Sequence, residues 1–145
     1  MTPPSRILVE GFDDRALAAV VRRAGERTVR FLRCPRVRVN IYGVSPETAR
    51  AINLAFRKRK GPAGILSFAL PGSDPEGERG EILLCVGTVR RLAAERSKTL
   101  KAMLSELAVH GMLHVLGFHH GSPGEEIRMA ALQRAIGGKI SGGRG

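Results

Sequence analysis

Apolar residues in this chain fall into short runs that predict four strands. Val37, Val39 and Ile41 alternate with polar residues, which is the period of a half-buried strand. The run at 65–70 barely alternates, so we expect that strand to be buried on both faces. A loop that holds glycine, proline and acidic residues is expected at 71–80. The four expected strands span residues 6–10, 36–42, 65–70 and 82–86.

Between and after the strands, apolar residues recur with a helical period, and capping residues mark the helix starts. Asp13 or Asp14 can cap the first helix, and Ser45 begins the second. Ser97 is the candidate cap of a helix that is apolar nearly all round, which places that helix at the centre of the core. The expected helices span about residues 14–31, 46–57, 88–96, 98–116 and 123–136. We expect one domain over residues 1–145, with a frayed glycine-rich tail at 137–145.

The charge balance of the chain points to a polyanionic partner. The sequence holds 24 Lys and Arg against 13 Asp and Glu, for a net charge of +11. A surplus this large attracts polyanions, and nucleic acid is the first to consider. The alternative is a basic surface that only serves solubility.

Cysteine usage and hydropathy predict the cellular compartment in which the protein works. Cys34 and Cys85 occur singly in apolar surroundings, so we expect core thiols in a reducing compartment and no disulfide framework. Residues 1–6 show no apolar stretch behind a basic start, and no segment approaches 18 consecutive apolar residues. We therefore expect a cytoplasmic protein with no membrane partner.

All four histidines lie within residues 109–120. On a helix, the i, i+4 spacing of His110 and His114 puts both imidazoles on one face. Gly117 can adopt the left-handed conformation that ends a helix, and the turn could bring His120 back to the first two. This is the ligand spacing of a metzincin metal helix, except that Gly111 replaces the general-base Glu. The pattern predicts a three-histidine metal site without the usual peptidase base.

Three neutral imidazoles would leave a catalytic zinc one open position, which a water fills, and they also suit nickel, copper or iron. We predict one Zn²⁺ ion on His110, His114 and His120. The alternative is that these are ordinary core or helix-surface histidines. Glu106 either hydrogen-bonds a ligand imidazole or is a solvated side chain. His119 is a supporting partner of the site, a further ligand or an exposed side chain.

The lack of a carboxylate at position 111, where the sequence has Gly111, is consistent with a phosphodiester substrate. Its transition state adds negative charge to phosphate oxygens, which a cation stabilises. Arginine does this well because its fork of donors matches phosphate geometry. Arg57, at the end of a predicted helix and before a predicted strand, is the candidate catalytic cation. The alternative is a helix-end cation that interacts only with the helix dipole.

The stretch from His110 to His120 resembles the metal motif of the YbeY family of rRNA maturation endoribonucleases. A second block, residues 52–57 with Pro62 and 66–68, is similar to another motif of that family. Gly80, Glu81 and Ile82 stand where the family has Gly-Asp-Ile. Order and spacing also agree, so the resemblance covers about residues 5–136.

The resemblance implies an α+β fold: a single domain with a mostly parallel four-stranded sheet, flanking helices and a central metal-binding helix. It implies a metal-dependent, single-strand-specific endoribonuclease in ribosomal RNA processing, notably at the small-subunit RNA 3′ end, and in ribosome quality control. The implied partners are ribosomal RNA, ribosomal particles and their proteins or assembly factors. The family's functional arginine maps onto Arg57 and its functional histidine onto His114, with zinc on His110, His114 and His120.

The chain departs from the family pattern in two places. Lys60, Ala63 and Gly64 replace two acids and a threonine, and His119 replaces an acid. These replacements make the expected cleft more positive, which favours RNA binding. Because the carboxylates are missing here, any role that they have in the family is in doubt for this chain. Two rival functions stay open: a metal hydrolase of another ester or amide, and a basic RNA- or ribosome-binding factor with a structural metal.

Overall fold

A four-stranded sheet forms one layer of the protein. The computed structural model describes residues 5–34, 36–55, 64–69, 78–118 and 121–141. The strands lie in the order β1-β2-β4-β3. β1 pairs with β2 and β2 with β4 in parallel, whereas β3 pairs with β4 antiparallel, so the prediction of a mostly parallel sheet is confirmed. Their bounds are β1 (Arg6–Glu10), β2 (Val37–Gly43), β3 (Ile65–Ala69) and β4 (Glu78–Leu84).

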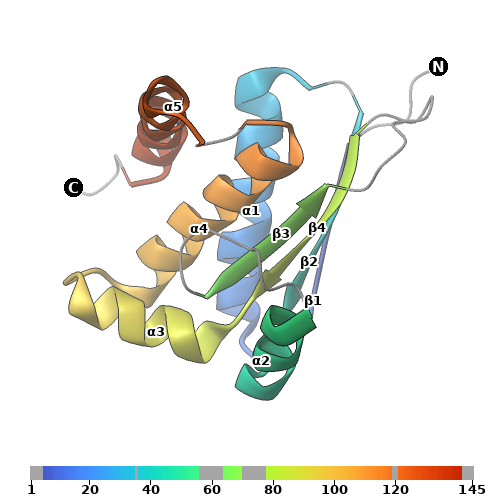
Figure 1. Cartoon of the computed structure of the whole chain (residues 1–145), viewed down its shortest axis with the longest axis vertical. Helices are drawn as coiled ribbons and strands as arrows, with labels where there is room; N and C mark the ends of the chain where they lie inside the picture. Colours follow the sequence, from blue (N-terminus) through green and yellow to red (C-terminus); the bar gives the residue numbers. More distant parts are fainter. Residues whose placement is uncertain (1–4, 35, 56–63, 70–77, 119–120, 142–145) are drawn as a thin grey trace.

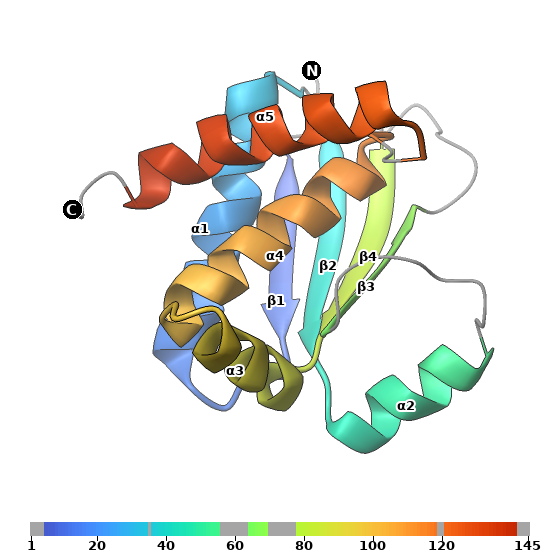
Figure 2. The ribbon, with the colours of Figure 1, turned by 60° about the vertical axis from the view of Figure 1, so that its left-hand side comes forward.

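Helices cover one face of the sheet, as the α+β prediction requires. α1 and α4 lie against that face, and α5 crosses α4 on the side away from the sheet (Figures 1 and 2). α2 lies beyond the end of the sheet where β2 stops. The helix bounds are α1 (Arg15–Leu32), α2 (Pro46–Ala55), α3 (Val86–Glu95), α4 (Leu100–Val115) and α5 (Pro123–Ser141).

Side-chain caps begin four of these helices, at Asp14, Ser45, Thr99 and Ser122. The Asp14 carboxylate accepts a hydrogen bond from the Ala16 amide, and Ser45 Oγ accepts one from the Thr48 amide. These bonds satisfy amides that have no partner within the first turn. α4 is capped by Thr99 and not by the predicted Ser97, which takes a left-handed φ of 55° before the helix.

Several strand and helix boundaries differ from the prediction. β4 begins at Glu78, inside the predicted loop at 71–80, and stops at Leu84 because α3 begins at Val86. β3 is an edge strand in which Ile65 and Leu66 are buried. Since consecutive side chains of a strand point to opposite faces, the predicted burial on both faces holds for these two residues but not for the rest of the strand. Its apolar run reflects packing at one end of the strand.

The C-terminal helix also differs from the prediction. α5 continues to Ser141, into the segment that was expected to be a frayed tail. Met129 and Ile136 are buried, whereas Ile127 is 71% exposed. The first turn of α5 therefore extends beyond the core that its later turns contact.

α4 occupies the centre of the core, as its all-round apolar pattern predicted. It contacts α1, α3, α5, β3 and β4. Its side chains are buried except along one stripe, which includes Ala102, Glu106, His110 and His114. Burial of apolar side chains is the main favourable term in folding. The buried residues of α4 are Met103, Leu104, Ser105, Leu107, Ala108, Val109, Gly111, Met112, Leu113 and Val115.

Candidate metal centre

His110 and His114 lie one helical turn apart on α4 and their rings face each other. The ring centroids are 5.3 Å apart, with 27° between the ring planes. Both residues are half-buried, and both Nε2 atoms are buried. The placement of two imidazoles on one helix face, expected from the i, i+4 spacing, is confirmed.

The helix ends directly after this pair, in a turn that Gly117 allows. The Gly117 amide donates to the His114 carbonyl at 3.0 Å, and the Phe118 amide donates to the Leu113 carbonyl at 2.9 Å. This is the Schellman pattern, and it requires the left-handed φ of 98° that Gly117 adopts. The predicted end of the helix is therefore confirmed. The third candidate ligand, His120, and its neighbour His119 lie outside the described residues.

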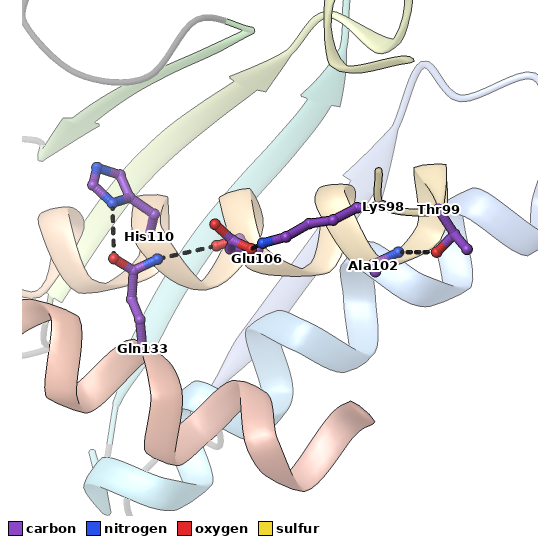
Figure 3. Close-up of polar contacts among 6 residues, drawn as sticks. All are labelled: Lys98, Thr99, Ala102, Glu106, His110 and Gln133. Carbon is purple, nitrogen blue, oxygen red and sulfur yellow. Dashed lines mark hydrogen bonds and ion pairs between the residues drawn. The ribbon is translucent and has the colours of Figure 1, made fainter. Parts of the chain in front are cut away.

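A side chain from another element lies at Nδ1 of each histidine. Oγ of Ser67, on β3, is 3.4 Å from Nδ1 of His114. Oε1 of Gln133, on α5, is 3.3 Å from Nδ1 of His110 (Figure 3). A contact at Nδ1 leaves Nε2 as the ring nitrogen that faces away from that partner, so a metal bound by either ring would be bound through Nε2.

Glu106 does not hydrogen-bond a histidine among the described contacts. Its carboxylate accepts a hydrogen bond from Nζ of Lys98, and both side chains are partly exposed (Figure 3). Its backbone carbonyl, however, accepts a hydrogen bond from Nε2 of Gln133 at 3.5 Å. Of the two alternatives from the sequence, the solvent-exposed side chain is the one observed.

Gln133 was missed by the sequence analysis. It follows Met129 by four residues and precedes Ile136 by three, and both of these are buried. A polar residue between two core residues of one helix face could have been noticed from the helical period. Its partner, 23 positions away along the chain, could not.

Gly111 faces the sheet and not the histidine pair. A Cβ at this position would lie 2.9 Å from Cδ1 of Ile65 and 3.1 Å from Cδ1 of Ile82. The absence of the peptidase glutamate therefore has a packing cause, since α4 approaches the sheet too closely there for a side chain. A polyanionic substrate is therefore not needed to explain why position 111 is a glycine.

These residues fit a first-row metal ion that prefers imidazole ligands. Two rings lie close together, their Nε2 atoms are buried, and their Nδ1 atoms have neighbours that hold the rings. In the described ranges no group of three metal-binding side chains occurs. A metal site built on His110 and His114 would therefore need a further ligand.

Comparison with known proteins identifies the family. The family model described as Endoribonuclease YbeY matches residues 9–141, which is nearly the whole chain and includes the histidine helix. The chain belongs to the YbeY family. The resemblance noted in the sequence is thus confirmed.

Curated YbeY relatives agree with this assignment. The chain is 38% identical over 104 residues to Endoribonuclease YbeY of Bordetella petrii, covering 71% of this chain and 66% of the relative. It is 42% identical over 88 residues to that of Bordetella pertussis (60% and 55%), and 35% identical over 109 residues to that of Methylococcus capsulatus (71% and 73%). The matches thus span just over half to two thirds of the two Bordetella proteins.

The fold of this YbeY-family chain is similar to a solution structure from Thermotoga maritima. The TM-score is 0.67 at 27% identity, covering 94% of this chain and 90% of the other. The single-domain α+β arrangement is therefore shared along nearly the full length.

The candidate catalytic cation of this YbeY-family chain, Arg57, lies outside the described residues, as do Lys60 and Ala63. The residues on either side of that segment are described. Asn53 at the end of α2 and Gly64 before β3 line one cavity of about 180 Å³. The role of Arg57 stays a prediction.

Two further expectations from the sequence can be compared with the structure. Cys85 is buried and Cys34 half-buried, and no disulfide joins them. Among the described helices, none is long and apolar enough to span a membrane.

Proposed function

We propose that this protein is a metal-dependent, single-strand-specific endoribonuclease that acts in ribosomal RNA processing. The proposed target is the 3′ end of small-subunit rRNA, with a further role in ribosome quality control. The observation that carries the proposal is the family match over residues 9–141, which includes the stacked histidine pair. We assign the activity to one domain that covers residues 1–145.

The proposed cofactor is one zinc ion on His110, His114 and His120. The buried Nε2 atoms of the first two support this assignment. When bound, zinc supplies Lewis acidity that polarises a phosphoryl oxygen. His114 acts as one of the ligands, and Ser67 holds its ring in place.

The proposed catalytic cation is Arg57, whose guanidinium stabilises the charge that develops on the phosphate oxygens. The net charge of +11 supports an RNA substrate because it favours association with a polyanion. The proposed partners are ribosomal RNA and ribosomal particles, with contacts to their proteins or assembly factors. The proposed location is the cytoplasm, as expected for a chain with two cysteines and no disulfide framework.

The test is cleavage of a single-stranded RNA and of its duplex by the purified, zinc-loaded protein. We expect the single strand alone to be cut, with no activity in His114→Ala. Arg57→Ala should lose about 10²–10³-fold in rate, as when one transition-state donor is removed. Arg22→Ala is the matched control because Arg22 is an exposed arginine on α1, and it should retain the rate.

Two outcomes would replace the proposal. Cleavage of casein that disappears in His114→Ala would identify a hydrolase of amides. RNA binding without cleavage, together with unfolding of His114→Ala, would identify a binding factor with a structural metal.

A further inference from the structure

Gln133 connects α5 to the histidine helix through both ends of its side-chain amide. Oε1 lies 3.3 Å from Nδ1 of His110, and Nε2 lies 3.5 Å from the backbone carbonyl oxygen of Glu106 (Figure 3). Because Met129 and Ile136 on the same face of α5 are 2% and 0% exposed, core packing fixes where the amide lies.

The carbonyl of Glu106 determines the orientation of that amide. A backbone carbonyl oxygen can only accept a hydrogen bond, so it must face the NH₂ group of Gln133. The reversed amide would place two acceptor oxygens against each other. With the NH₂ group at Glu106, the acceptor Oε1 is the atom that faces His110.

The amide orientation in turn selects the tautomer of His110. Oε1 can only accept, so Nδ1 of His110 must carry the hydrogen. A neutral imidazole protonated at Nδ1 has its lone pair on Nε2. That nitrogen is the buried one, on the ring that stacks with His114.

We propose that Gln133 is a positioning residue that fixes the tautomer and ring orientation of His110 for metal binding. Ser67 cannot do the same at His114, because a hydroxyl both donates and accepts and so tolerates either tautomer. The metal part of this inference rests on the proposed function. The tautomer part does not, because it concerns the metal-free protein.

The first test measures the tautomer without metal. Long-range ¹H–¹⁵N NMR at about pH 8, above the ordinary histidine pKa of about 6.5, reports which ring nitrogen of His110 carries hydrogen. We expect Nδ1–H in the wild type and a mixture in Gln133→Met, which keeps the side-chain length without polar atoms. Gln133→Glu, which keeps an acceptor at His110 but loses the donor to the Glu106 carbonyl, should restore Nδ1–H at least in part.

The second test measures zinc affinity by competition with a chromophoric chelator. Gln133→Met should weaken binding by about 10–100-fold, the usual effect of removing a partner of a ligand histidine. Gln133→Glu should recover at least part of that loss. Arg134→Met, at the exposed neighbouring position on α5, is the control and should bind within twofold of the wild type.

The outcomes separate this inference from the proposed function. If folded Gln133→Met keeps both the wild-type tautomer and the wild-type affinity, Gln133 has no positioning role, whatever the enzyme does. If the wild type binds no zinc while its His110 tautomer depends on Gln133, the positioning role stands and the proposed metal site fails.

Discussion

Oγ of Ser67, on the edge strand β3, lies 3.4 Å from Nδ1 of His114 on α4. The contact joins the sheet to the histidine pair from the side opposite Gln133. The two rings are therefore held by different elements, β3 at His114 and α5 at His110. A histidine pair supported in this way does not depend on a bound metal for its orientation.

Loss of the Ser67 hydroxyl should weaken metal binding modestly. We expect Ser67→Ala to lower zinc affinity by roughly tenfold or less, since the contact is long and the hydroxyl does not select a tautomer. Competition titration measures the effect, and Ser67→Thr, which keeps a hydroxyl, should stay closer to the wild type. An unchanged affinity in Ser67→Ala would show that β3 does not support His114.

Installing the missing glutamate should not create a peptidase. Gly111→Glu would force a carboxylate against Ile65 and Ile82, so we expect a loss of about 3 kcal/mol or more in the free energy of unfolding. Gly111→Ala should cost about 2 kcal/mol or less, because roughly 1 kcal/mol of helix propensity offsets the overpacking. Urea unfolding and a casein assay check both variants.

The crowding at Gly111 can be tested by removing the side-chain atom that would lie nearest to a Cβ added there. Ile65→Val removes Cδ1, the atom 2.9 Å from the added Cβ. The double variant Gly111→Ala, Ile65→Val should therefore be more stable than the sum of the two single effects predicts. Simple additivity would mean that Ile65 does not limit position 111.

The turn after α4 should be sensitive to a side chain at Gly117. Gly117→Ala places a Cβ at a φ of 98°, so we expect a loss of about 1 kcal/mol in stability. Zinc affinity should fall as well, since the turn leads towards His120. Gly87→Ala is the matched control: its added Cβ meets nothing within 4 Å, and its stability should be unchanged or slightly higher.

Removal of metal should lower the melting temperature without unfolding the protein. At a zinc concentration of 100 times Kd, bound metal adds about 2.7 kcal/mol, which corresponds to roughly 5–10 °C for a domain of this size. The core of α4 forms without the ion, so the chelated protein should keep its circular dichroism spectrum at 25 °C. Unfolding on chelation at that temperature would support the structural-metal alternative.

Local patterns in the sequence predicted much of the fold. The alternation of Val37, Val39 and Ile41 located β2, and the all-round apolar pattern located α4 at the centre. Both depend on neighbouring residues of one element, which a single sequence displays. The Gly117 turn was predictable for the same reason.

Features that depend on distant contacts were not predictable. Thr99 and Ser97 are equally good caps by residue type, and only the path of the chain from α3 favours Thr99. The edge position of β3 follows from strand pairing, to which its apolar run gives no clue. The Gln133–His110 contact joins two helices across 23 positions, and no local pattern marks it.

The histidine pair sits on the helix that the rest of the core surrounds. Amide hydrogens in such a helix exchange only through openings close to global unfolding, so α4 should be among the last segments to exchange. Its neighbours α1, α3, α5 and the sheet prevent it from rotating or sliding independently. The spacing of the two histidines is therefore as stable as the fold itself, and the adjustable part of the candidate site lies in the residues around the rings.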